Sequence, residues 1–164
     1  LGRLPDRIIT NERPENLREI NKQILSWANN KGIVRYTPNK PTVEDYERFL
    51  SKFDNPIITL HGWLRVIPPE LCEKYKIING HPGLITEYPE LKGKDPQIRA
   101  YRGKYKQAGC VLHRVTKGVD EGGVIATGKF NAEKLEIEEL FLKFRDTSLS
   151  MWVMFLTKLL GIHK

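Results

Sequence analysis

The sequence has 164 residues, of which 40% are hydrophobic and 29% are charged, and its formal net charge is +7. These values predict one soluble, globular domain over residues 1–164 and exclude a low-complexity chain. Two cysteines, Cys72 and Cys110, are too few for a disulfide framework and have no metal-ligand spacing, so we expect a reduced, cytoplasmic protein that binds no metal. No signal peptide is visible, and the apolar segment 149–162 is too short to span a bilayer.

The positive charge is concentrated in one segment. Between Lys92 and Lys117 lie eight basic residues and one acid, Asp95, whereas the rest of the chain holds 19 of its 27 basic and 19 of its 20 acidic residues. A local basic excess favours an anionic substrate, or nucleic acid that could stack on the interleaved Tyr101 and Tyr105. A solvated helix and loop would give the same composition, so charge alone leaves both interpretations open.

The first half of the chain alternates apolar runs with helical periodicities. We expect strands at residues 7–10, 32–36, 56–60 and 75–78. We expect helices that start at Pro14 and end within 29–32, start at Thr42 and reach Phe53, and occupy 68–75. Thr42 and Asp45 resemble a capping box. Strands separated by helices favour parallel pairing with crossover connections.

The second half adds three shorter elements and one long helix. We expect a helix at 95–105 and strands at 109–115 and 123–127. A long terminal helix covers about 135–160, with a possible kink at 146–150. The elements together predict an α/β fold with a mostly parallel sheet, flanking helices and a long C-terminal helix.

The candidate site lies where the apolar run 75–78 meets the segment 79–82, Asn-Gly-His-Pro. Glycine and proline interrupt regular structure there, so we expect His81 on a stiff turn at the end of a strand, where α/β sheets bind ligands. Asn79 could donate to an oxyanion, His81 could transfer a proton, and Asp120 could orient and charge the imidazole. Taken singly, such residues more often form turns or fill cores, and their spacing does not show that they meet.

Several motifs in order resemble the folate-dependent formyltransferase family. They are Asn-x-His-Pro at 79–82, Val-x-His at 111–113, Val-Asp-x-Gly-x-Val-Ile at 119–125, and the strand and turn at 60–68. The family includes phosphoribosylglycinamide, methionyl-tRNA and sugar-nucleotide N-formyltransferases. The resemblance runs from about residue 8 to 160 and is specific between 56 and 126. It implies a Rossmann-like fold and transfer of a formyl group from 10-formyltetrahydrofolate, the co-substrate, to an amine.

The resemblance also implies roles for three catalytic residues. Asn79 would bind the formyl oxygen, His81 as imidazolium would support the tetrahedral intermediate, and Asp120 would stabilise that imidazolium. We therefore expect the pKa of His81 to lie above that of an isolated histidine. An exposed turn aspartate would add little to stability. His61, His113 and Cys110 are interpreted as structural.

In the family, backbone groups form most of the folate-binding site. The resemblance implies that the corresponding residues here are Arg65, Val66 and Ile67 after one strand, and Thr116, Lys117, Gly118 and Val119 before Asp120.

Two departures from the family pattern concern the amine acceptor. Residues 82–86 replace the usual Ser-Leu-Leu-Pro loop. No glycine-rich turn appears near the N-terminus, so either the first strand and helix of the fold are missing from this sequence or the acceptor is held in another way.

The resemblance leaves several acceptors open. We expect a small anionic amine, most like the phosphoribosylglycinamide of purine biosynthesis. An amino-sugar nucleotide or an aminoacyl-tRNA is the alternative, because the segment 92–96 is similar to a loop of that branch. A non-catalytic, basic nucleic-acid-binding module is a further alternative, no membrane partner is expected, and the sequence gives no oligomeric state.

Overall fold

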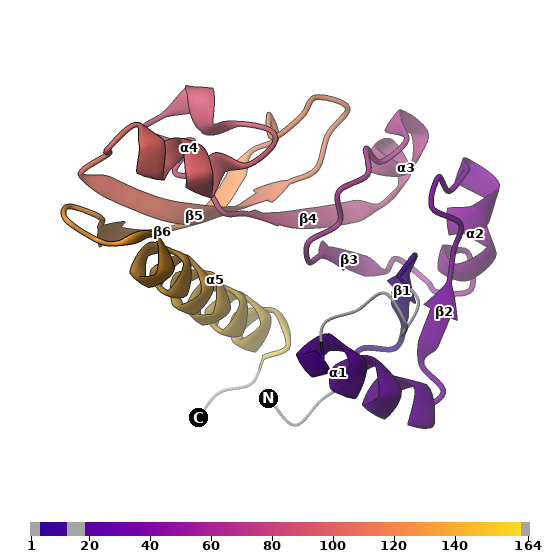
Figure 1. The fold of residues 1–164 in the computed structure, drawn as a ribbon. Helices are drawn as coiled ribbons and strands as arrows, with labels where there is room; N and C mark the ends of the chain where they lie inside the picture. The colour runs from indigo at the N-terminus through magenta and orange to yellow at the C-terminus, as the bar shows by residue number, and fades with distance from the viewer. Residues whose placement is uncertain (1–3, 13–18, 162–164) are drawn as a thin grey trace. The chain divides into compact units, whose positions relative to one another are not determined.

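The computed structural model describes residues 4–12 and 19–161 (Figure 1). The chain divides into two compact units, Gly2–Asp54 and Asn55–Lys164. Each unit has its own sheet, two-stranded in the first and four-stranded in the second.

The first unit contains a strand–helix–strand crossover. Strand β1 (Ile8–Thr10) pairs in parallel with β2 (Val34–Tyr36), and helix α1 (Glu19–Asn30) connects them. Leu25, Ala28 and Val34 form the core of this unit. The predicted start of the helix at Pro14 lies outside the described residues, whereas its end at Asn30 is confirmed.

Helix α2 (Val43–Leu50) begins with the predicted capping box. The Thr42 hydroxyl accepts from the Asp45 amide at 3.3 Å, and the Asp45 carboxylate accepts from the Thr42 amide at 2.9 Å. The helix ends at Leu50 and does not reach Phe53 as predicted, and the Arg7 guanidinium lies 5.9 Å from the Phe53 ring centre.

The second unit is built on four strands in the order β3-β4-β5-β6. These are β3 (Ile57–Leu60), β4 (Lys76–His81), β5 (Gln107–Arg114) and β6 (Val124–Asn131). The predicted α/β fold with parallel strands is confirmed in the pairs β1–β2 and β3–β4. From β4 onward the pairing is antiparallel, because β5 returns beside β4 and β6 follows as its hairpin partner.

Four helices complete the second unit. They are α3 (Pro69–Lys74), the 3₁₀ turn η2 (Pro89–Leu91), α4 (Pro96–Arg102) and α5 (Ile137–Leu159). Helix α5 lies along β5 and β6 and is continuous through 146–150, where a kink was a possibility (Figure 1). The buried core beneath it includes Leu140, Phe144, Met151 and Trp152 from α5 and Cys110, Val111 and Leu112 from β5. None of the described helices is long and apolar enough to cross a membrane.

Strand β4 is longer than predicted, and this corrects the expected position of His81. The strand continues through Asn79 to His81, because β5 pairs with it: Asn79 is opposite His113, and His81 is opposite Val111. His81 therefore lies at the end of a strand and not on a turn. Alternation along the strand places Asn79 and His81 on one face and Gly80 on the other.

Gly80 fits this strand because its opposite face is crowded. A Cβ atom at Gly80 would lie 2.7 Å from Trp152 Nε1 on α5. Glycine at position 80 lets β4 and α5 pack closely. From the sequence alone we interpreted this glycine as a break in the strand.

Candidate active site

The three predicted catalytic residues meet in one polar cluster. Asp120 Oδ2 lies 3.2 Å from His81 Nδ1, and Asp120 Oδ1 lies 3.3 Å from His113 Nε2. The same His113 Nε2 lies 3.2 Å from Asn79 Nδ2. Asp120 therefore bridges two imidazoles, and His113 links the carboxylate to the amide.

His113 is the member that sequence reasoning missed. It is buried, with 2% of its surface exposed, and its Nδ1 lies 3.0 Å from the Arg114 carbonyl oxygen. We interpreted it as a structural core histidine, but it contacts two of the three candidate catalytic residues. Its position in the Val-x-His motif was visible in the sequence, whereas its pairing opposite Asn79 required the antiparallel register of β4 and β5.

The loop between β5 and β6 brings Asp120 back to the sheet. Asp120 has a left-handed backbone with φ of 52°. The Arg114 amide donates to the Gly123 carbonyl at 2.9 Å, and a Cβ at Gly122 would lie 1.7 Å from the Arg114 carbonyl oxygen, so this closure requires glycine at 122.

The Asp120 carboxylate is enclosed, which corrects the expectation of an exposed turn aspartate. Only 11% of its side chain is exposed, and Oδ2 also accepts from the Gly93 amide at 2.8 Å. Burial acts to raise the pKa of Asp120, but hydrogen bonds from His113 and Gly93 and the charge of His81 together bring it below its ordinary value. The carboxylate is therefore ionised at neutral pH.

Both ring nitrogens of His81 face oxygen acceptors. Nε2 lies 2.9 Å from the Leu91 carbonyl oxygen, and Nδ1 faces the Asp120 carboxylate. Either neutral tautomer leaves one nitrogen lone pair against an oxygen lone pair, whereas the imidazolium donates to both.

The pKa of His81 is lowered, so the expectation of a raised value is wrong. Burial disfavours the charged ring and outweighs the Asp120 carboxylate and the Leu91 carbonyl, which both favour it. His113 and Arg99 add to the lowering. With 5% of its surface exposed, His81 loses more hydration than its partners return.

The residues expected to bind folate lie in two loops. Arg65 and Val66 are exposed after β3, whereas Ile67 is buried. In the loop after β5, Thr116, Lys117 and Val119 are exposed and Gly118 is half-buried. The pairing of Leu60 with Asn79 places the first loop beside the end of β4.

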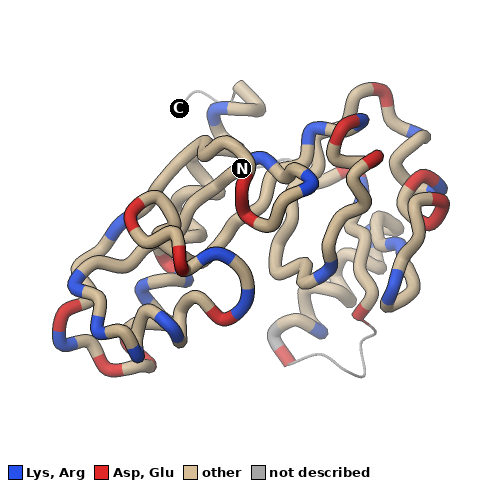
Figure 2. The backbone as a smooth tube through the Cα atoms, turned by 90° about the horizontal axis from the view of Figure 1, so that it is seen from above, with Lys and Arg blue, Asp and Glu red and all other residues tan. Residues whose placement is uncertain are grey.

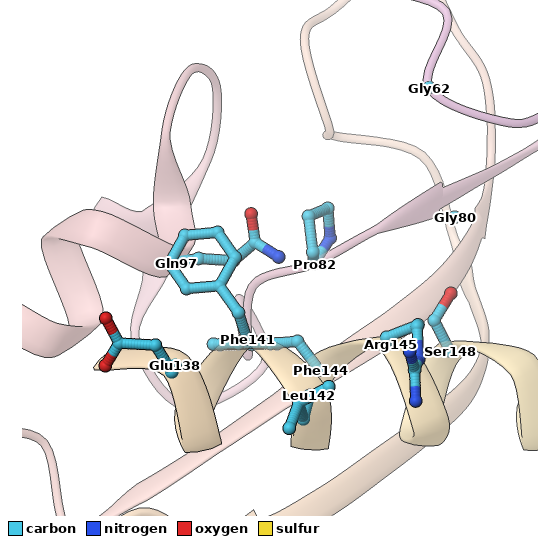
Figure 3. Close-up of a pocket in the computed structure, with 10 residues that line it drawn as sticks. All are labelled: Gly62, Gly80, Pro82, Gln97, Glu138, Phe141, Leu142, Phe144, Arg145 and Ser148. Atoms are coloured by element: carbon cyan, nitrogen blue, oxygen red, sulfur yellow. The ribbon is translucent and has the colours of Figure 1, made fainter. Parts of the chain in front are cut away.

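A groove lies on the other face of β4, against α5. Its volume is about 660 Å³. The residues that line it are Gly62, Gly80, Pro82, Gln97, Glu138, Phe141, Leu142, Phe144, Arg145 and Ser148 (Figure 3). Figure 3 shows the α5 side chains on one side of it and Pro82 and Gln97 on the other. It meets β4 at Gly80 and extends to Pro82, which follows the strand, while the Asn79 and His81 side chains belong to the opposite face.

Two other sequence interpretations concern cysteine and metals. Burial raises the pKa of Cys110 to about 12, and its Sγ donates to the Phe144 carbonyl at 3.5 Å, so it is a core residue and not a nucleophile. Within residues 4–12 and 19–161, no group of three or more His, Cys, Asp or Glu side chains is placed to hold a metal ion.

The lysines and arginines drawn blue in Figure 2 include those of the basic segment 92–117, and part of this segment contributes to the fold. Tyr105 stacks on Tyr88 with ring centres 4.3 Å apart, and its hydroxyl donates to Glu90 at 2.5 Å. Tyr105, one of the two tyrosines in this segment, therefore packs within the protein. Of the eight basic side chains in the segment, Arg99 is half-buried and the other seven are exposed: Lys92, Lys94, Arg102, Lys104, Lys106, Arg114 and Lys117.

The fold and the cluster define an α/β protein whose site combines an amide, two imidazoles and a carboxylate on and beside the two central strands of a sheet. The family model for formyl transferase matches residues 7–152. The chain therefore belongs to the formyl transferase family.

Similar proteins from several organisms agree with this assignment. The phosphoribosylglycinamide formyltransferase of Bacillus subtilis is 38% identical over 85 residues, which cover 51% of this chain and 40% of the relative. The methionyl-tRNA formyltransferase of Orientia tsutsugamushi is 28% identical over 133 residues, covering 77% of this chain and 42% of the relative. The chain thus spans about two fifths of these curated relatives.

Solved structures of the same kind share the fold. The phosphoribosylglycinamide formyltransferase of Anaplasma phagocytophilum superposes with a TM-score of 0.72 at 26% identity, covering 88% of this chain and 69% of that one.

Proposed function

We propose that this chain forms the catalytic domain of a folate-dependent N-formyltransferase. The observation that carries the proposal is the Asp120 bridge between His81 and His113 next to the Asn79 amide. Family membership supports it, and the family match at 7–152 runs through both compact units, which supports one domain over 1–164. The proposed enzyme is cytoplasmic and uses no metal.

The proposed reaction moves a formyl group from 10-formyltetrahydrofolate to an amine. The amine nitrogen attacks the formyl carbon, the carbon–nitrogen bond to folate then breaks, and the proton released by the amine passes to the leaving folate nitrogen. The Asn79 amide donates to the formyl oxygen as it becomes an oxyanion. Such a donor is worth about 3 kcal/mol of barrier.

His81 is proposed to transfer a proton, and Asp120 to stabilise the positive charge of the protonated His81 ring. The His81 imidazolium stabilises the oxyanion intermediate, and proton transfer at this ring is expected to contribute roughly 10²–10⁴ in rate. Asp120 stays ionised and offsets part of the cost of charging a buried ring. Because burial lowers the pKa of His81, the ring is mostly neutral near neutral pH and has to take up a proton during the reaction before it can stabilise the oxyanion.

We propose that folate binds through backbone groups of two loops. These are Arg65, Val66 and Ile67 after β3, and Thr116, Lys117, Gly118 and Val119 before Asp120. Arg65 and Val66 in the first loop and Thr116, Lys117 and Val119 in the second are exposed and accessible to a ligand, whereas Ile67 is buried.

The proposed acceptor approaches the face of β4 that carries the Asn79 and His81 side chains, because its amine must reach the formyl carbon there. The exposed basic side chains of the segment 92–117 would attract an anionic acceptor. Phosphoribosylglycinamide is the proposed acceptor, which would place the protein in purine biosynthesis. An amino-sugar nucleotide and an aminoacyl-tRNA remain the alternatives.

The test is transfer from 10-formyltetrahydrofolate to one amine at a time. The panel is phosphoribosylglycinamide, an amino-sugar nucleotide and a charged initiator tRNA, with formate release in the absence of amine as the measure of transfer to water. We expect formylated phosphoribosylglycinamide from the wild type and loss of product in Asn79→Ala and His81→Ala. No product and no formate from a protein that binds folate would refute the enzyme.

The non-catalytic nucleic-acid module predicts a different result. It would bind generic RNA or DNA with a steep dependence on salt, because phosphate contacts release counterions. Substitution of the exposed lysines Lys104 and Lys106 by Glu would abolish such binding. The same substitutions would leave formyl transfer to a small amine unchanged.

A further inference from the structure

Arg99 is a half-buried cation of α4 that the proposed mechanism does not use. Its guanidinium donates to three successive backbone carbonyls, those of Glu90, Leu91 and Lys92. The distance is 3.1 Å to the Leu91 oxygen and 2.6 Å to the Lys92 oxygen. One planar group thus fixes the orientation of three peptide units.

The segment that Arg99 holds also supports the catalytic pair. The Leu91 carbonyl accepts from His81 Nε2 at 2.9 Å, and the Gly93 amide donates to Asp120 Oδ2 at 2.8 Å. Leu91 itself is 1% exposed, so its carbonyl has no water to replace either donor. Residues 90–93 therefore contact both members of the His81–Asp120 pair from one short stretch of backbone.

We propose that Arg99 is a positioning residue that acts through the Leu91 carbonyl to hold the His81 ring with Nε2 protonated and Nδ1 facing Asp120. The inference rests on the proposed formyl transfer for its kinetic consequence, but not for its structural one. In this orientation His81 gains and loses its proton at Nδ1, next to the carboxylate, while Nε2–H remains bonded to Leu91. We call the hydrogen bonds from Arg99 to the carbonyls of residues 90–92 the clamp. Without the clamp the Leu91 carbonyl can turn away, and the His81 ring loses the contact that selects its tautomer.

A positioning role and a purely electrostatic role of Arg99 predict opposite changes in the pKa of His81 when Arg99 is replaced. The groups that face it are Asp120, His113 and Arg99, together with the Leu91 carbonyl. The positive charge of Arg99 lowers the pKa of His81, whereas the Leu91 hydrogen bond raises it and is the larger of the two effects. If Arg99 acts through Leu91, removing the clamp lowers the pKa further; if it acts only as a charge, removing the charge raises it.

Two substitutions separate these roles. Arg99→Lys keeps the charge but not the planar fork, and Arg99→Gln removes both. Arg102→Gln is the matched control, because Arg102 is an exposed arginine on the same helix. His81 is followed by nitrogen-15 and proton NMR against pH in the folded proteins, without substrate.

In the wild type we expect Nε2 to stay protonated on both sides of the titration and Nδ1 to be the nitrogen that titrates. In both Arg99 variants we expect the His81 pKa to fall and Nε2–H to exchange faster with water, whereas Arg102→Gln should match the wild type. The kcat of formyl transfer should fall by roughly tenfold or more in both Arg99 variants, with the folate KM within about twofold.

Three outcomes would overturn the proposal. An Nε2 that loses its proton in the wild type contradicts the assigned tautomer. An unchanged pKa in Arg99→Lys with a raised pKa in Arg99→Gln assigns Arg99 a purely electrostatic role, and variants that do not fold assign it to stability alone. Expected titrations in a protein without transferase activity would instead retain the positioning role and reject the proposed function.

Discussion

Asn79 and His113 are opposite each other on neighbouring antiparallel strands, with Asn79 Nδ2 3.2 Å from His113 Nε2. His113, which we interpreted as structural from the sequence, therefore links the proposed oxyanion donor Asn79 to Asp120. A substitution at His113 should affect both Asn79 and Asp120.

We expect His113→Gln to lower kcat by roughly tenfold or more while leaving folate affinity nearly unchanged, because Asn79 and Asp120 lose a shared partner. Steady-state kinetics of His113→Gln, Asp120→Asn and the double variant measure the coupling. Effects that multiply independently would mean that His113 does not act through Asp120.

Asp120→Asn should change both titration and stability. The His81 pKa should fall further, because the carboxylate that favours the charged ring is removed. Formyl transfer should drop by a factor on the order of 10² or more. Since the side chain is enclosed and bonded on two sides, we also expect a loss of about 1–3 kcal/mol in the free energy of unfolding. Ring-proton NMR and urea unfolding test these expectations, and an unmoved His81 titration would remove Asp120 from the mechanism.

Stability should fall in two stages as the solution is acidified. The lowered pKa of His81 means that the unfolded chain binds more protons than the native one as the pH falls through the ordinary histidine value, so stability is lost there. The lowered pKa of Asp120 adds a second loss as the pH falls below the ordinary aspartate value. Urea unfolding from pH 8 to pH 3 measures both. His81→Gln should flatten part of the first stage, to which His61 also contributes because burial lowers its pKa as well, and Asp120→Asn should flatten the second. Curves parallel to the wild type would contradict the assignment.

Gly80→Ala should destabilise the protein by about 1–3 kcal/mol, because the added methyl group meets the Trp152 indole. Gly123→Ala is the control, since a Cβ there meets nothing within 4 Å. Thermal unfolding and tryptophan fluorescence report the two variants. Equal stabilities would show that α5 can move away from β4 at no cost.

Local patterns predicted the fold because they act over short distances. The Thr42–Asp45 capping box and the strand preceding Asn79 follow from neighbouring residues, and both are present. The order of motifs likewise indicated Asn79, His81 and Asp120, which the structure brings together.

What could not be predicted depends on contacts between distant segments. The role of His113 and the extension of β4 through Gly80 both depend on the pairing of β4 with β5, and the need for glycine at position 80 depends on Trp152 from α5. The direction of the His81 pKa depends on how completely the ring is buried, which no sequence pattern gives. Arg99 escaped notice because its three partners are backbone carbonyls, whose positions carry no side-chain signature.

Asn79 has a strand on each side, since it is in register with Leu60 of β3 and with His113 of β5. A residue held this way has no hinge next to it, and its amide should exchange with deuterium only when the whole unit unfolds. The site would then be preformed before any ligand arrives, and motion during turnover would be left to the loops that surround the strand.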